Sequence, residues 1–253
     1  MELANTTAIV TGAASGLGAA TARAFADKGA RVIGLDLQQS IDGAAAVEGL
    51  TYVACDVTDE AQVRAAVERA SADSAAPLRA VVNCAGIAPS ARIVGRKGAH
   101  DLALYRKVVE INLIGSFTVL AVASEAIAQT EPDADGQRGV IINTASIAAY
   151  DGQVGQAAYA SSKGGIVGLT LPAARDLAQY GIRVVTIAPG IVETPMLATV
   201  SDEFRAGLAA GVPFPQRLAR PEEYAQLALA IVDHDYLNGE TIRMDGALRM
   251  APR

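Results

Sequence analysis

The chain has 253 residues, of which 51% are hydrophobic and 19% are charged, and its formal net charge is −6. An intrinsically disordered protein lacks the apolar side chains for a core, so this composition excludes that class and indicates a globular protein. The acidic balance also lacks the basic footprint of a nucleic-acid binder, and we expect no nucleic-acid partner.

The first residues, MELANTTAIVTG, enter a strand pattern almost at once and leave no room for a secretory signal or a transit peptide. No apolar run approaches the roughly 18 residues of a membrane span. These features predict a cytoplasmic protein with no membrane contact. His100, His234, Cys55 and Cys84 show no ligand spacing, so the sequence predicts no metal site and two reduced thiols.

Short β-branched runs alternate along the chain with Ala- and Leu-rich segments of helical periodicity. The runs typical of strands are 6–12, 30–36, 51–57, 79–86, 139–146, 182–190 and 239–246. The helical segments are 16–28, 60–72, 101–130, 157–180 and 221–233. Most runs are continuously apolar, as strands buried on both faces are, and the alternation predicts parallel strands with helices on both faces. With no linker or repeat to divide it, we expect residues 1–253 to form a single α/β domain around a doubly wound, seven-stranded parallel sheet.

The first expected strand is followed by VTGAASGLG, in which the glycines form the pattern TGxxxGxG. With a strand before it and a helix after it, this is a variant of the dinucleotide-binding fingerprint of the Rossmann fold. Glycines let the turn close and let backbone N–H groups approach a pyrophosphate at the positive end of the helix. The alternative is a set of ordinary turn glycines. The cofactor-binding residues that we assign here are Gly12, Ser15, Gly16, Leu17 and Gly18.

Asp36 closes the second expected strand, about twenty residues beyond the glycines, where a carboxylate accepts hydrogen bonds from the ribose hydroxyls of a dinucleotide. It would repel the additional phosphate of NADP. Its neighbours Leu37, Gln38 and Gln39 offer no cation. The sequence therefore predicts NAD rather than NADP, with a helix cap or a turn residue as the alternative role of Asp36.

The third and fourth expected strands also end beside the point where the strand order reverses, and ligands bind there. The cofactor-binding residues that we assign to these ends are Asp56, Val57, Asn83, Cys84, Ala85 and Gly86. A helix cap at Thr58 or Asp59 is the alternative at the third strand. In the order 3-2-1-4, Cys55 and Cys84 lie about three strand spacings apart, which exceeds the roughly 7 Å that a disulfide can bridge.

The stretch AAYASSKGG places Tyr159 and Lys163 four residues apart, on one face of the expected helix 157–180. An isolated pair of this kind is usually a surface Tyr resting on a Lys stem. Here Ser146 ends the fifth expected strand thirteen positions earlier, and Asn112 lies inside the expected helix 101–130.

These residues, together with TGAASGLG, NCAG and a Pro-Gly pair after the sixth strand, resemble the short-chain dehydrogenase/reductase family from end to end. The resemblance implies an NAD-dependent oxidoreductase whose catalytic group is Asn112, Ser146, Tyr159 and Lys163. It also implies cofactor contacts from Tyr159, Lys163, Pro189, Gly190, Val192 and Thr194. Taken singly, Ser146 could cap a strand end, Asn112 could kink a helix and Lys163 could be a solvated charge.

The implied chemistry explains the residue types. A phenol has a pKa of about 10, which is too high for a base near neutrality. The nearby ammonium of Lys163 favours the phenolate of Tyr159 and can also bind the nicotinamide ribose. By the resemblance, Ser146 holds and polarises the substrate oxygen, and Asn112 positions a water in a proton path.

After Thr194, the segment to about residue 216 mixes apolar residues with Pro and Gly, and we interpret it as a mobile substrate lid. A short core helix is the alternative. The residues that we expect to bind substrate are Ser146, Tyr159, Met196, Leu197 and Phe204, with Leu208 and Phe214 also in the lid.

Residues 137–178 and 212–250 look like the type II 3-hydroxyacyl-CoA dehydrogenases, which implies a 3-hydroxyacyl-CoA substrate and a homotetramer. A hydroxysteroid, another secondary alcohol or ketone, a carrier-protein thioester, or a non-enzymatic scaffold are the alternatives. Basic residues after the fourth strand are candidates for binding the CoA phosphates, although a solvated charge run has the same appearance. They are Arg92, Arg96, Lys97, Arg106 and Lys107.

Overall fold

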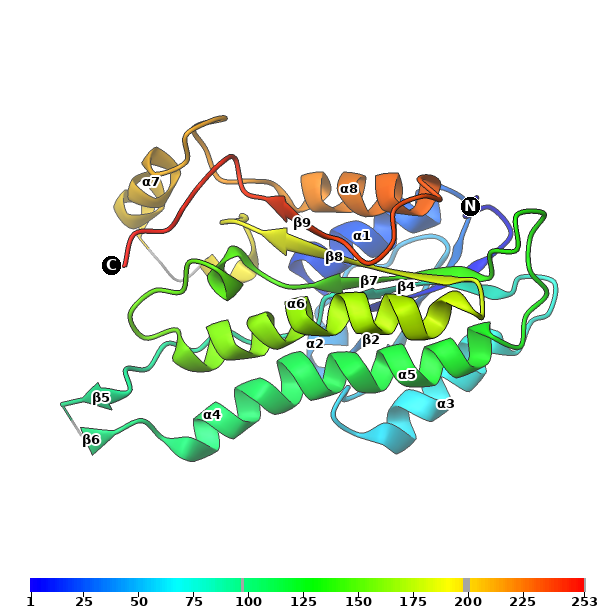
Figure 1. The fold of residues 1–253 in the computed structure, drawn as a ribbon, viewed down its shortest axis with the longest axis horizontal. Coiled ribbons are helices and arrows are strands. Elements are labelled where there is room, and N and C mark those ends of the chain that lie inside the picture. The colour runs from blue at the N-terminus through cyan, green and yellow to red at the C-terminus, as the bar shows by residue number, and fades with distance from the viewer. Residues whose placement is uncertain (97, 198–200, 253) are drawn as a thin grey trace.

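The structure, a computed structural model, describes residues 1–96, 98–197 and 201–252. Its main sheet has seven strands: β1 (Thr7–Thr11), β2 (Arg31–Asp36), β3 (Leu50–Ala54), β4 (Leu78–Asn83), β7 (Gly139–Thr144), β8 (Ile182–Pro189) and β9 (Thr241–Met244). They pair in parallel in the order β3-β2-β1-β4-β7-β8-β9 (Figure 1). The order reverses between β1 and β4, and ligands bind at the carboxyl ends of such strands. The predicted doubly wound, seven-stranded Rossmann fold is confirmed.

Helices cover both faces of this sheet (Figure 1). They are α1 (Gly16–Asp27), α3 (Glu60–Ser71), α4 (Leu102–Val109), η1 (Glu110–Gly115), α5 (Ser116–Ile127), α6 (Ala157–Ala178) and α8 (Pro221–Asp233). On β1, Ile9 belongs to the apolar cluster with side chains of α3, α5 and α6, whereas Val10 belongs to the cluster with α1 and α8. Because neighbouring strand residues point to opposite faces, burial on both faces requires the continuous apolar runs of the sequence.

The elements α4, η1 and α5 form one continuous helix, Leu102–Ile127 (Figure 1). This helix contradicts the expectation that no apolar segment approaches the length of a membrane span, because its most apolar 18-residue window has a mean hydropathy of 1.5. Half of that window is buried inside the protein, where the helix packs against α3 and α6. A core helix meets the same criteria of length and composition.

The shorter elements gather mainly at the carboxyl end of the sheet, on the left in Figure 1. They are the antiparallel hairpin of β5 (Val94–Gly95) and β6 (Gly98–Ala99), and η2 (Ile147–Ala149), η3 (Pro195–Leu197) and α7 (Asp202–Ala210), while α2 (Gln38–Ile41) follows β2. The predicted lid contains η3 and α7. None of the described side chains of α7 is buried, so the alternative of a core helix is wrong.

Candidate active site

The loop between β1 and α1 is closed by glycines. Gly12 (φ +65°) and Gly16 (φ +54°) adopt a left-handed backbone conformation that favours glycine. A Cβ atom at Gly18 would collide with the carbonyl oxygen of Gly12. Ser15 is the N-cap residue of α1 but makes no side-chain hydrogen bond there, and Leu17 lies in the first turn. The first N–H groups of α1 therefore lie at a loop that its glycines keep tight, which fits the pyrophosphate of a dinucleotide.

The carboxylate of Asp36 lies against this loop. Its Oδ2 atom accepts a 3.0 Å hydrogen bond from the backbone N–H of Ala14, and its Oδ1 atom accepts one of 2.8 Å from Leu37. The N-cap residue of α2 is Leu37, so Asp36 does not cap that helix. Instead it places a negative charge at the end of β2 beside the glycine cradle, where the sequence predicts the adenosine ribose.

At the end of β3, Asp56 closes a turn by accepting hydrogen bonds from the N–H and the hydroxyl of Thr58, at 2.9 and 2.7 Å. Asp59 caps α3 by accepting two N–H donors of its first turn, so the cap alternative is correct for this residue. Val57 is 7% exposed, and a Cβ atom at Gly115 would lie 2.7 Å from it. Val57 therefore packs on the long helix, and adenine contacts by Asp56 and Val57 stay a prediction.

The ends of β1 and β4 are joined at the floor of the crevice. The hydroxyl oxygen of Thr11 accepts hydrogen bonds from the backbone N–H groups of Cys84 and Ala85, each at 3.0 Å. Asn83 is 2% exposed and donates to the side-chain oxygen of Asn143 at 2.9 Å. Both cysteines are free, as predicted. These contacts fix the two strand ends that border the expected cofactor site.

The predicted catalytic group lies at the end of β7 and on the first turns of α6. Lys163 is only 4% exposed, and its Nζ atom donates a 2.7 Å hydrogen bond to the carbonyl oxygen of Thr144. The same atom lies 5.9 Å from the centre of the Tyr159 ring. Ser146 is the N-cap residue of η2, and its Oγ atom accepts from the N–H of Ala148 at 3.1 Å. A strand end and one helix face thus bring a hydroxyl, a phenol and an ammonium together.

Burial shifts the ionisation of the two key groups in opposite directions. It raises the pKa of the Tyr159 phenol, and the Ser146 side chain opposes part of that change. It lowers the pKa of the Lys163 amine to about 8. Lys163 is therefore not a solvated surface charge, which was the alternative for this residue.

Asn112 lies in the π-helical turn η1, where the long helix changes its hydrogen-bond register. Its side chain accepts from the N–H of Ile87 at 2.8 Å and donates to the Ile87 carbonyl at 2.9 Å and to the hydroxyl of Ser162 at 3.0 Å. A Cβ atom at Gly86 would lie 3.1 Å from Oδ1 of Asn112 and 3.6 Å from Nζ of Lys163. Glycine at position 86 therefore leaves a small space shared by the amide and the ammonium.

The segment after β8 covers the glycine cradle. Gly190 follows Pro189, the last residue of β8, and Val192 forms a bridge with Ala219. A Cβ atom at Gly16 would lie 3.4 Å from the methyl group of Thr194, which places Thr194 over the cofactor loop. Leu197 is partly buried, and Phe204 is 57% exposed on α7. The side chain of Met196 and all of Lys97 lie outside the described residues.

The sequence reasoning missed the part that Arg243 has in this site. Its guanidinium donates to Asp151 at 2.6 Å and to Asp245 at 2.7 Å and lies over the ring of Tyr150, 5.1 Å from its centre. Ile147, next to Ser146, packs with Val212 and Leu248 in a separate apolar cluster. The C-terminal segment therefore holds the loop after Ser146, and the apolar character of MDGALRM was the only signal of this in the sequence.

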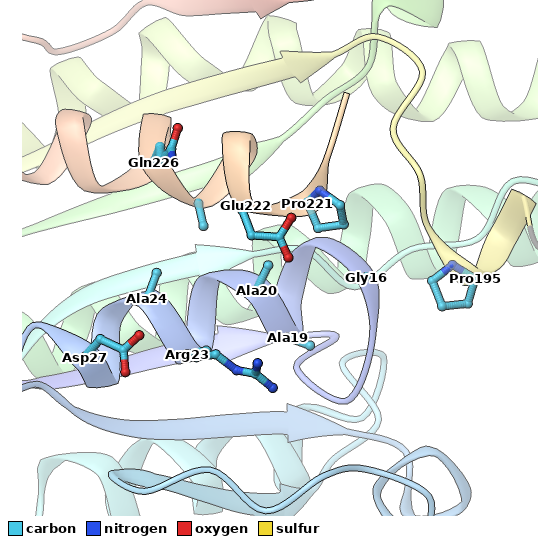
Figure 2. A pocket seen from close by; sticks show the side chains of 11 residues that line it. Gly16, Ala19, Ala20, Arg23, Ala24, Asp27, Pro195, Pro221, Glu222 and Gln226 are labelled. Carbon is cyan, nitrogen blue, oxygen red and sulfur yellow. The ribbon is translucent and has the colours of Figure 1, made fainter. Parts of the chain in front are cut away.

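A hollow of about 410 Å³ lies between α1 and α8. Figure 2 shows Arg23 and Asp27 of α1 and Glu222 and Gln226 of α8 along it, with Gly16 and Pro195 at one end. None of the predicted catalytic side chains lines it. Among the residues that the structure describes, no group of three or more His, Cys, Asp or Glu side chains could hold a metal ion.

The site has the features of an oxidoreductase with a nicotinamide cofactor. A glycine cradle lies where the strand order reverses, a carboxylate lies at the end of β2, and a Tyr–Lys pair lies beside the crevice. The family model described as short chain dehydrogenase matches residues 6–204. The chain therefore belongs to the short-chain dehydrogenase family, as the sequence motifs predicted.

Relatives match nearly the whole chain. The chain is 51% identical over 251 residues to 3-hydroxyacyl-CoA dehydrogenase type-2 of Bos taurus, covering 97% of this chain and 95% of that protein. It is 49% identical over 250 residues to the human protein of the same name, with the same coverage of 97% and 95%. The crystal structure of 3-hydroxyacyl-CoA dehydrogenase type-2 from Mycobacterium avium superposes with a TM-score of 0.91 at 41% identity, covering 98% of both chains. The predicted resemblance to this subgroup is confirmed.

Proposed function

We propose that this short-chain dehydrogenase oxidises the 3-hydroxyl group of a 3-hydroxyacyl-CoA to the 3-ketone, reversibly, with NAD as its cofactor. The observation that carries the proposal is the buried Lys163 beside Tyr159 and Ser146, in a chain half identical to relatives named 3-hydroxyacyl-CoA dehydrogenase type-2. The same chemistry serves other secondary alcohols, so the substrate assignment depends on the relatives and the catalytic assignment on the geometry.

The side chains of this site divide the work of proton removal. Bound NAD supplies the acceptor for the hydride. The Tyr159 phenolate accepts the proton of the substrate hydroxyl, and the ammonium of Lys163 stabilises the phenolate. The hydroxyl of Ser146 holds the substrate oxygen in place. Asn112 orders a water beside Lys163, in the small space at Gly86 that its Oδ1 atom shares with Nζ of Lys163.

The preference for NAD rests on the position of Asp36. Its carboxylate touches the N–H of Ala14 in the glycine loop, so it lies where the ribose of a dinucleotide bound at that loop would be. A phosphate on this ribose would meet a negative charge. Neither Leu37 nor Gln38 supplies a positive charge to compensate.

The CoA end of the substrate has a candidate site on the β5–β6 hairpin. At the base of the hairpin, the N–H of Ala91 donates to the carbonyl of Gly155 at 2.9 Å, in the loop that precedes α6. The hairpin therefore begins beside the active-site loop. Arg92 and Arg96 are exposed on it and can meet phosphate groups at the entrance.

Assembly as a homotetramer and a cytoplasmic location belong to the same proposal. On α6, Gly164 and Gly168 lie one turn apart, and a Cβ atom at either would meet open space, which leaves bare backbone for close packing of a second helix. Phe117 of α5 is 49% exposed. Two free cysteines suit a reducing compartment.

The proposal is tested by following NADH absorbance with purified protein. We expect oxidation of NADH with acetoacetyl-CoA, and slower or no reaction with a hydroxysteroid ketone, a small uncharged ketone or acetoacetyl-carrier protein. A faster reaction with one of the other substrates would reassign the substrate within the same family. No turnover with any of them would support the scaffold alternative.

A further inference from the structure

Three side chains from different elements meet under the active site, on the opposite face of the sheet from α6. Cys84 follows β4, Thr144 is the last residue of β7, and Tyr224 lies on α8 and is fully buried. The hydroxyl oxygens of Thr144 and Tyr224 are 2.7 Å apart. The Cys84 sulfur is 3.6 Å from the Thr144 hydroxyl and 3.7 Å from that of Tyr224.

These three contacts form a closed ring of hydrogen bonds in which each group donates to the next. The Thr144 hydroxyl donates to the sulfur of Cys84, and the Cys84 thiol donates to the oxygen of Tyr224. Each group carries one hydrogen, so the hydroxyl of Tyr224 is the donor that remains for Thr144. Burial raises the pKa of the Cys84 thiol and of the Tyr224 phenol, so both stay protonated and keep their donor roles.

Thr144 connects this ring to the catalytic lysine. Its side chain belongs to the ring on one face of the sheet, and its backbone carbonyl accepts the 2.7 Å hydrogen bond from Nζ of Lys163. Lys163 has little freedom to move, because its side chain is 4% exposed. The titratable groups that face it are Tyr159 and the protonated thiol of Cys84. A rotation at the end of β7 would therefore move the ammonium with respect to Tyr159.

We propose that Tyr224 is a positioning residue of this enzyme: it fixes Thr144, whose carbonyl holds the ammonium of Lys163 beside Tyr159. The inference rests on the roles of Tyr159 and Lys163 in the proposed function. Tyr224 is fully buried, and its hydroxyl acts through its contacts with Thr144 and Cys84. Its effect is then on the ionisation of the base and not on substrate binding.

The test measures kcat/KM for oxidation of 3-hydroxybutyryl-CoA across pH with Tyr224→Phe. A less fixed ammonium stabilises the phenolate less. We therefore expect the rising limb of the pH profile to move upward by about half a pH unit, so that kcat/KM falls about threefold at pH values below the limb. The alkaline plateau and KM should stay near their original values. Thr170→Val is the matched control, because Thr170 is a buried hydroxyl on α6 that pairs with Thr186 at 2.6 Å. It should lower thermal stability but leave the limb in place.

Further variants keep the proposal falsifiable if Tyr224→Phe does not fold. Thr144→Val removes the same hydrogen bond and should shift the limb equally, whereas Thr144→Ser keeps the hydroxyl and should restore the original profile. An unshifted limb in both Tyr224→Phe and Thr144→Val, or an equal shift in Thr170→Val, would overturn the proposal. The Tyr159→Phe variant distinguishes a failure of this proposal from a failure of the proposed function. If Tyr159→Phe is active, the base is misassigned. If Tyr159→Phe is inactive and the pH profile of Tyr224→Phe is unshifted, only the positioning role of Tyr224 is rejected.

Discussion

Nζ of Lys163 lies 5.9 Å from the centre of the Tyr159 ring, one turn away on the same face of α6. A cation held this close to the ring favours the charged phenolate over the neutral phenol. Burial raises the pKa of the Tyr159 phenol, and the Ser146 side chain opposes part of that change. In the proposed mechanism the ammonium of Lys163 also favours the phenolate.

Replacing Tyr159 by Phe should abolish turnover and leave NAD affinity nearly unchanged, because the phenol contributes mainly a transferable proton. Lys163→Ala should weaken both turnover and NAD binding, since the ammonium serves the phenolate and the ribose. Steady-state assays and calorimetric titration with NAD measure the two effects. Retention of a substantial fraction of the activity in Tyr159→Phe would show that another group is the base.

Lys163→Met should stabilise the cofactor-free protein most below pH 8. The folded-state pKa of Lys163 is about 8, below the ordinary value of 10.5. Between these two pH values the unfolded chain therefore binds more protons than the folded protein. The original protein consequently gains stability as the pH rises from 8 to 10.5. The stability difference between variant and original should therefore shrink from pH 8 to 10.5. Thermal unfolding at several pH values measures it, and a difference that stays constant would mean that the buried amine is not destabilised by its charge.

The protein should bind NAD at least tenfold more tightly than NADP, because Asp36 lies against the glycine loop. Asp36→Asn with Leu37→Arg should move the preference towards NADP, since it removes the negative charge and adds a cation. Asn keeps an acceptor for the N–H of Ala14, so it alters the loop less than Ala, which we expect to weaken both cofactors. Fluorescence titration with both cofactors checks this, and equal affinities in the original protein would refute the role of Asp36.

The features that were predictable from sequence are those that local pattern determines. The continuous apolar run around Ile9 and Val10 is what a strand buried on two faces requires, and it predicted β1 correctly. The four-residue spacing of Tyr159 and Lys163 predicted that both lie on one helix face, and both lie on α6. The sequence also placed the glycine loop between a strand and a helix, where the structure has it.

The features that were not predictable depend on residues far apart in the chain. The π turn at Asn112 accompanies hydrogen bonds to Ile87, twenty-five positions earlier, and no helical periodicity signals such a contact. Arg243 holds the loop after Ser146 through Asp151, ninety-two positions away. The sequence indicated that Tyr224 lies on a helix, but only the packing of α8 on the sheet brings its hydroxyl to Thr144.

In solution the protein should have four times the 25.9 kDa mass of one chain. The exposed Phe117 on α5 and the bare backbone at Gly164 and Gly168 on α6 are the surfaces that we expect a second copy to cover. Phe117→Glu should give smaller species, because it would bury a charge between subunits. Tyr236→Glu, at a side chain that is 95% exposed beyond α8, is the control that should leave the mass unchanged. Light scattering at micromolar concentration measures both, and a monomer mass for the original protein rejects the tetramer.

The hairpin of β5 and β6 carries the basic residues nearest to the expected entrance of the active site. The basic residues predicted from the sequence separate in the structure: Arg92 and Arg96 lie on or beside the hairpin, whereas Arg106 and Lys107 end α4. The hairpin is bonded at its base to the loop that precedes α6. We therefore expect the CoA phosphates to meet Arg92 and Arg96.

Arg92→Glu with Arg96→Glu should raise KM for acetoacetyl-CoA at least tenfold, because it replaces attraction by repulsion at exposed groups. It should leave kcat and the KM for an uncharged ketone nearly unchanged. The penalty should shrink with added salt, since exposed charges are screened over about 8 Å at physiological ionic strength. The control is Lys28→Glu with Arg69→Glu, which changes net charge equally at exposed residues after α1 and at the end of α3. If the control variant raises KM for acetoacetyl-CoA as much, the effect comes from net charge. Equal kinetic losses with acetoacetyl-CoA and with the uncharged ketone would instead assign the hairpin a structural role and favour a substrate without CoA.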